Sequence, residues 1–143
     1  MDDFAGQYKN LFERTSDLIH FVSVEGIIMK VNGAWLSTLE YSEGEVLGHK
    51  IFEFLHPDCL EEFKTYRHQI INNINPGVIR TSFVTKAGKT INLEGLVSAS
   101  LGEGELKYTS GVFRDITAKV IAQKRLQTFF NSAPDAIVVI NHH

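Results

Sequence analysis

Residues 87–90 read Ala-Gly-Lys-Thr, the order of residues that closes a phosphate-binding P-loop. A P-loop also needs a glycine five residues before Gly88, and this chain has Phe83 there. A P-loop joins a strand to a helix, whereas both flanks of residues 87–90 are rich in the β-branched and aromatic residues typical of strands. We therefore interpret residues 87–88 as the turn of a β-hairpin, not as part of a nucleotide site.

Histidines and acidic residues are the other candidates for chemistry. His20, His49, His56 and His68 lack the short paired spacing of metal ligands, and no cluster of cysteines accompanies them. No Ser/His/Asp set or pair of carboxylates stands out, and the acidic residues fall mostly at predicted turns and helix starts. The sequence predicts no metal site and no catalytic residue, although a site assembled only in three dimensions stays open.

Length and composition restrict the class of protein. The chain has 143 residues, of which 43% are hydrophobic, and this suits one domain with a sizeable core. The formal net charge is −3 and no basic run is present, so we expect no nucleic-acid partner. A single cysteine, Cys59, excludes an internal disulfide and fits a reducing cytoplasm. Acidic residues at positions 2 and 3 do not fit a signal peptide, and no apolar run approaches the ~20 residues of a membrane span. We expect a cytoplasmic module, whose parent protein can still have a membrane anchor elsewhere.

Hydrophobic patterns place strands on both sides of a helical middle section. We expect strands at residues 17–23, 27–31, 78–86, 90–100 and 106–115. Between the second and third strands, Asn32 and Ser42 are predicted helix caps, and a longer helix capped by Asp58 runs to about Asn72. After the last strand, residues 118–130 contain no Gly or Pro and are predicted to be helical. The order of two strands, short helices and a three-strand meander indicates an α+β fold.

The last strand and the helix after it carry a family resemblance. Residues 107–117 read Lys-Tyr-Thr-Ser-Gly-Val-Phe-Arg-Asp-Ile-Thr, and this ending resembles the C-terminal end of PAS sensory domains. Residues 31–32, 41–48 and 56–58 are also similar to PAS sequences. The resemblance implies a PAS-like five-stranded antiparallel sheet with short helices on one face, flanked by N-terminal and C-terminal helices.

PAS modules sense a signal and pass it to an output domain of the same chain, so the resemblance implies sensing without catalysis. We expect the parent protein to be a sensor histidine kinase of a two-component phosphorelay system. A diguanylate cyclase or phosphodiesterase is the alternative parent, and a PAS domain that serves only as a dimerising scaffold is the alternative function. Within the tail motif, Arg114, Asp115 and Thr117 are expected to transmit the signal from the sheet to the output helix.

The chain is predicted to contain more than the PAS domain itself. We assign residues 1–12 to an N-terminal amphipathic helix and residues 13–117 to the PAS domain. Residues 118–130 are assigned to a linker helix, and residues 131–143 to the truncated start of a second PAS domain. The last assignment rests on a repeat, because a phenylalanine and an aspartate five residues apart precede an apolar strand twice, at Phe12 and again at Phe130. His142 and His143 are interpreted as the possible start of a purification tag.

Apolar stripes on the two flanking helices predict a homodimer. The stripes consist of Phe4, Tyr8, Leu11 and Phe12 in the first helix and Ala118, Ala122, Leu126 and Phe129 in the second. The second set recurs at spacings of four, four and three residues, close to a coiled-coil seam.

The resemblance also permits a test for flavin. Flavin-binding light sensors of the PAS superfamily have a reactive cysteine and hold the polar edge of the flavin with two Asn and one Gln. The matching positions here are Ile51 for the cysteine and Phe83, Leu93 and Phe113 for the polar residues. Apolar side chains cannot pair with that edge, and leaving it unpaired is costly, so we exclude flavin.

Haem is the second cofactor to consider. Haem-binding PAS sensors take a histidine from a position that falls near Phe63 or Lys64 here, and His68 lies about one turn further on. We therefore expect no cofactor, and haem is the less favoured alternative.

A small apolar organic ligand on the concave side of the sheet, or a fully packed core without one, is the remaining choice. The residues expected to surround this space are His20, Val22, Leu39, Ile51, Phe54, Phe63, Ile70, Phe83, Leu93, Val97 and Phe113. His20 and Val22 belong to this set only if the flavin-sensor alignment holds, because their strand is apolar on both faces. An inward His20 would hydrogen-bond a carboxylate of the ligand or a backbone carbonyl.

Overall fold

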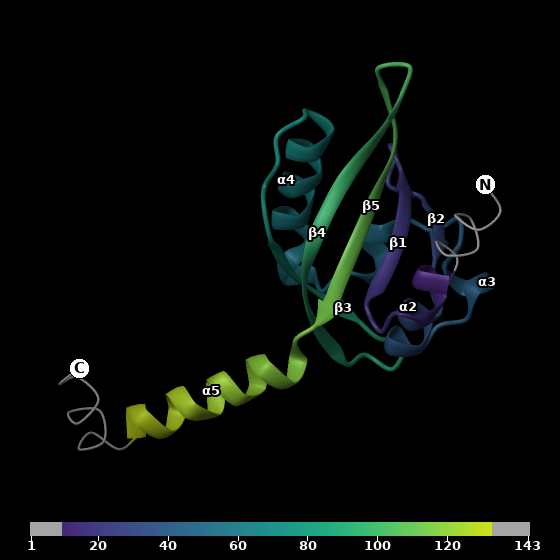
Figure 1. Ribbon diagram of the computed structural model, residues 1–143. Helices are drawn as coiled ribbons and strands as arrows, with labels where there is room; N and C mark the ends of the chain where they lie inside the picture. Colours follow the sequence, from purple (N-terminus) through teal and green to yellow (C-terminus); the bar gives the residue numbers. More distant parts are fainter. Residues whose placement is uncertain (1–9, 133–143) are drawn as a thin grey trace.

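One antiparallel sheet of five strands organises the molecule (Figure 1). The structure is a computed structural model that describes residues 10–132. The strands are β1 (Leu18–Ser23), β2 (Ile28–Val31), β3 (Ile79–Val84), β4 (Thr90–Gly102) and β5 (Glu105–Asp115), in the spatial order β2-β1-β5-β4-β3. The helices are α2 (Gly33–Leu39), α3 (Glu43–Val46), η1 (Ile51–Phe54), η2 (Pro57–Cys59), α4 (Leu60–Ile71) and α5 (Thr117–Ser132), and residues 10–14 are helical as well. The predicted α+β fold is confirmed.

The Ala-Gly-Lys-Thr segment is the turn of the β3–β4 hairpin, as predicted. The backbone N–H of Thr85 donates to the carbonyl of Lys89 at 2.8 Å, and the N–H of Lys89 donates to Oγ1 of Thr85 at 3.0 Å. Gly88 has a φ of +91°, a conformation that favours glycine. This geometry contradicts a P-loop, because the segment leads from one strand into another.

Asn32 caps α2 and also ties the start of the domain together. Its Oδ1 accepts from the N–H groups of Trp35 at 3.0 Å and Ile19 at 3.1 Å. Its Nδ2 donates to the carbonyls of Phe12 and Asp17, both at 2.9 Å. The side chain is completely buried, so its hydrogen-bonding groups must be satisfied from within the protein. The predicted cap is confirmed, and it also fixes the entry into β1.

The longer helix α4 does not have the predicted cap. We expected Asp58, but the residue before α4 is Cys59, which makes no side-chain cap hydrogen bond. The side chain of His56 instead caps the short helix η2 ahead of α4, where it accepts from the backbone N–H of Asp58 at 3.1 Å. The backbone N–H of His56 donates to the carbonyl of Ser82 at 2.8 Å, which ties this segment to β3. His56 therefore has a structural role at the junction of η1 and α4.

Helices cover one face of the sheet and build the core against it (Figure 1). The alternation along β1 is regular: Leu18, His20 and Val22 are buried, and the residues between them are only partly buried. Trp35 from α2 and Phe63 from α4 pack into the same core. Helix α5 has no buried residue and projects away from the sheet (Figure 1). Within residues 10–132, no helix has the length and apolarity needed to cross a lipid bilayer.

The remaining predicted segments lie largely outside the described residues. Residues 1–9 of the N-terminal helix and residues 133–143 of the proposed second repeat are not described. The division of the chain into four segments therefore stays a prediction.

Candidate functional site

A cluster of aromatic rings fills the concave side of the sheet, where the ligand was expected. Phe83 is at its centre, with ring centroids 6.4 Å from His20, 6.0 Å from Trp35, 6.4 Å from Phe63 and 6.5 Å from Phe113. All five side chains are buried. Edge-to-face and offset contacts at these separations stabilise aromatic clusters beyond the burial of their area.

The structure brings together most of the side chains predicted to surround a ligand. Those buried in the continuous core around Phe83 are His20, Val22, Leu39, Ile51, Phe54, Phe63, Leu93 and Phe113. Ile70 is also buried in this core, Val97 packs against it, and both line a surface groove with a volume of about 280 Å³. Residues 73–75 form another wall of the groove. The predicted set thus divides into a packed interior and a groove beside it.

His20 points inward and has a partner that the sequence did not indicate. The indole N–H of Trp35 donates to Nδ1 of His20 at 3.3 Å. The imidazole contacts both Phe83 and Phe113, whose rings also contact each other, and Gly111 on β5 leaves room for it, because a Cβ there would lie 2.5 Å from Nε2. Burial, and to a smaller extent the charge of Arg67, lower the pKa of His20 from 6.5 to about 3. His20 is therefore neutral at physiological pH.

Arg67 is a buried cation that joins α4 to the far end of the sheet. Its guanidinium donates to Oγ1 of Thr109 at 3.0 Å and to the carbonyls of Ser23 at 3.1 Å and Val24 at 3.2 Å. Within residues 10–132 it makes no ion pair, and burial lowers its pKa. The side chain is only 6% exposed. In the sequence, Arg67 lies at helical spacing from Phe63. This spacing was the sole sequence signal that the Arg67 side chain points inward.

The residues expected to transmit a signal form a joint between β4, β5 and α5. Oδ1 of Asp115 accepts from the backbone N–H of Thr117 at 2.9 Å and from its hydroxyl at 2.6 Å. Oγ1 of Thr117 accepts from the backbone N–H of Asn92 on β4 at 2.9 Å. The N–H of Ile116 donates to the carbonyl of Asn92 at 2.8 Å, and the Asn92 side chain accepts from the Ser82 hydroxyl on β3 at 3.0 Å. Asn92 and Ser82 are additional members of this joint that the sequence did not reveal.

Arg114 lies apart from that joint. It is exposed and pairs in register with Glu94 on β4, whose carboxylate contacts Arg80 on β3 at 3.3 Å. The structure thus brings Asp115 and Thr117 together and leaves Arg114 on the outer face of the sheet.

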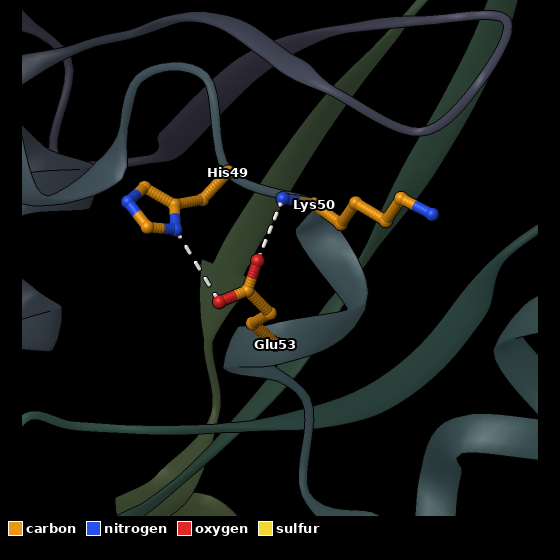
Figure 2. A network of polar contacts seen from close by, with 3 residues as sticks. All are labelled: His49, Lys50 and Glu53. Atoms are coloured by element: carbon orange, nitrogen blue, oxygen red, sulfur yellow. Dashed lines mark hydrogen bonds and ion pairs between the residues drawn. The ribbon is translucent and has the colours of Figure 1, made fainter.

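The polar contacts of His49 show a structural arrangement, not a metal site. Figure 2 shows Glu53 reaching back to the start of η1, where Oε2 accepts from the backbone N–H of Lys50 at 3.0 Å and Oε1 contacts Nδ1 of His49 at 3.3 Å. Reciprocal contacts of this kind fix the first turn of a helix. No group of three His, Cys, Asp or Glu side chains in residues 10–132 is placed to hold a metal ion.

The positions that hold flavin in light sensors do not fit flavin here. Ile51, Phe83, Leu93 and Phe113 are buried and present only apolar atoms, so they offer no partner for the polar edge of an isoalloxazine. For haem, Phe63 packs against Phe83 in the core.

The two other residues considered for haem lie outside the core. Lys64 and His68 are both exposed. Neither presents a ligand to the interior of the domain.

Comparisons with known proteins agree with this geometry. A protein family described as "PAS domain" matches residues 16–118. The PAS domain of an HTR-like protein from Haloarcula marismortui has 26% sequence identity and a TM-score of 0.67, with 81% of this chain and 100% of that chain covered. A PAS domain from Colwellia psychrerythraea has 20% identity and a TM-score of 0.74, with 81% and 99% covered. A PAS domain from a two-component sensor histidine kinase has 14% identity and a TM-score of 0.64, with 80% and 99% covered. No curated protein matches the chain.

Proposed function

Because the chain belongs to the PAS domain family, we propose that it is the sensing and transmitting module of a cytoplasmic sensor histidine kinase in a two-component system. Membership of the PAS family supports a sensory role in general. The kinase output is part of our proposal, supported by a similar fold in a PAS domain of a two-component sensor histidine kinase.

The observation that carries the proposal is the joint at the start of α5. Thr117 is held by Asp115 on its own strand and by Asn92 on the neighbouring strand. A shift of β4 against β5 therefore changes the direction in which α5 leaves the sheet. Helix α5 has no buried residue, so most of its surface is free of contact with the described part of the domain. Its exposed Leu126 and Phe129 suit contact with a second α5 in a homodimer.

A small apolar ligand would act by rearranging the aromatic cluster. Phe113 packs against Phe83 and lies two residues before Asp115, so displacing its ring would move the end of β5. Such a ligand would enter through the groove at Ile70 and Val97, because Ile70 belongs to the core and also lines this groove. The purely scaffolding alternative is favoured by the same cluster, because its rings already fill the space by packing on one another.

The test is to join this domain through α5 to a histidine kinase output and to measure autophosphorylation. The double variant Asp115→Ala/Thr117→Ala removes side-chain hydrogen bonds at the joint, each worth about 1 kcal/mol. We expect the domain to remain folded and its regulation of the kinase to be lost, because transmission needs contacts that differ between two states. The control is Ser37→Ala, an exposed hydroxyl on α2 away from the joint. Normal regulation by the double variant would contradict the proposal.

A further inference from the structure

Strand β4 extends well beyond the strand beside it. The pairing of β3 with β4 ends at Ile79 and Gly95, so residues 96–102 have β5 on one side only. Among residues 10–132, no strand pairs with their other side. Figure 1 shows β4 and β5 continuing together into a hairpin whose end extends past the other strands. A strand edge of this kind presents unpaired N–H and C=O groups, which are a template for another strand.

The segment itself lacks charge and proline, two of the features that usually prevent pairing, and a groove separates it from the end of α4 and residues 73–75. Residues 96–102 read Leu-Val-Ser-Ala-Ser-Leu-Gly and contain no charge and no proline. The irregularity beside it belongs to β5, where Lys107 is the extra residue between the pairs formed by Ser100 and Leu101. The edge of β4 itself is therefore regular.

Exposed apolar side chains border this edge on both sides. On the strand, Leu96 is 54% exposed and Leu101 is 63% exposed. Across the groove of about 280 Å³, Ile74 is 54% exposed. Apolar surface gathered along an unpaired backbone edge is the combination that strand addition buries.

We propose that two copies of this chain associate through antiparallel pairing of the exposed β4 edge, residues 96–102. The occupant is a second copy because the segment is complementary to itself. It carries no charge, so a two-fold axis through it brings no like charges together, and an isologous contact needs only this one patch.

The register follows from symmetry and side-chain parity. Directly opposite residues in an antiparallel pair place their side chains on the same face of the sheet. A two-fold axis perpendicular to the sheet therefore pairs odd-numbered residues with odd-numbered ones and even-numbered residues with even-numbered ones. If the axis passes through Ala99, the whole segment 96–102 pairs with the same segment of the second copy. Val97 then lies opposite Leu101 of the second copy, and Ser98 lies opposite its Ser100. Small side chains meet at the axis, and apolar ones flank them.

This interface is separate from association through α5, because residues 96–102 and α5 lie at opposite ends of β5 (Figure 1). The inference goes beyond the proposed sensory function. The proposed function stands or falls independently of whether the β4 edge forms a dimer interface.

The first experiment places charges at the axis. Ala99 is exposed, so Ala99→Lys and Ala99→Glu are compatible with the fold. Each variant alone brings two like charges together and should raise the dimer dissociation constant about fivefold or more, whereas an equimolar mixture should recover dimers. The control is Met29→Lys on β2, at the other end of the sheet. Sedimentation velocity over a range of concentrations gives the dissociation constants. A wild-type chain that stays monomeric, single variants that dimerise normally, or a mixture that does not recover would each overturn the proposal.

The second experiment tests the register without added charge. In a Cys59→Ser background, Ala99→Cys places two thiols opposite each other, and mild oxidation should give a covalent dimer. In the same background, Ser98→Cys places the two thiols two residues apart along the strands, roughly 7 Å, and should cross-link far more slowly. Equal rates, or no cross-link at position 99, would overturn the register and with it the proposal. Association through α5 alone gives no cross-link at either position.

Discussion

The indole N–H of Trp35 donates a hydrogen bond to Nδ1 of His20 at 3.3 Å in the interior of the domain. An N–H donor requires the acceptor nitrogen to be unprotonated, so the bond exists only with neutral imidazole. A buried neutral histidine links the stability of the fold to pH.

The pH prediction concerns His20→Asn. The native pKa of about 3 lies below the ordinary value of 6.5, so between these values the unfolded chain binds a proton that the native chain does not. The free energy of unfolding of the wild type should therefore fall, by up to about 1.4 kcal/mol per pH unit, as the pH drops from 6.5 towards 3. His20→Asn should remove this slope. Urea denaturation at several pH values measures it, and Val22→Ala is the control that lowers stability while keeping the slope. An unchanged slope in His20→Asn would show that other groups cause the pH dependence.

Replacing glycine with alanine should lower the stability of the fold at two positions and raise it at a third. A Cβ at Gly111 would meet the His20 ring, which packs against Phe83 and Phe113, and a Cβ at Gly95 would lie 2.0 Å from the carbonyl oxygen of Val112. We expect each substitution to cost about 2 kcal/mol or more through overpacking. Gly44 on α3 has no atom within 4 Å of such a Cβ, and Gly44→Ala should stabilise by about 0.5–1 kcal/mol. Thermal denaturation measures all three. A neutral Gly111→Ala would mean that the His20 ring can shift.

A double-mutant cycle should detect the tie between α4 and β5. Arg67→Met removes the guanidinium donor from the Thr109 hydroxyl and from the carbonyls of Ser23 and Val24, of which the Ser23 carbonyl keeps the N–H of Gly26, so we expect a loss of about 2 kcal/mol. Thr109→Val combined with it should cost less than the sum of the two changes, by about 1 kcal/mol or more. Lys64→Met on the exposed side of α4 is the control and should change stability by less than about 0.5 kcal/mol. Additive losses in the cycle would contradict an energetic role for this hydrogen bond.

The purified protein should be colourless. Ile51, Phe83, Leu93 and Phe113 offer no polar partner to a flavin, and His68 is exposed instead of facing the core. We expect no flavin band and no Soret band, and added flavin mononucleotide should separate from the protein on gel filtration. Mass spectrometry of the same sample detects any colourless ligand that co-purifies. Stoichiometric absorbance of either cofactor would contradict the prediction.

The sequence by itself determined the order of the elements and the fold, because these depend on neighbours along the chain. The apolar strand at residues 17–23, the Asn32 cap and the tail motif at Asp115–Thr117 are local patterns, and each corresponds to the element observed. The predicted cap at α4 was wrong because a short helix intervenes. His56 caps η2, and α4 follows directly after Cys59 without a side-chain cap.

Only the tertiary structure decided which side chains meet. The partner of Arg67 is 42 residues away at Thr109, that of His20 is 15 residues away at Trp35, and Thr117 is fastened to a backbone group 25 residues earlier. Periodicity reports which face of an element is buried, whereas these contacts depend on strand register and on how helices lie across the sheet. The unpaired edge of β4 has the same origin, because it exists only where β3 begins at Ile79 and β4 continues past Gly95.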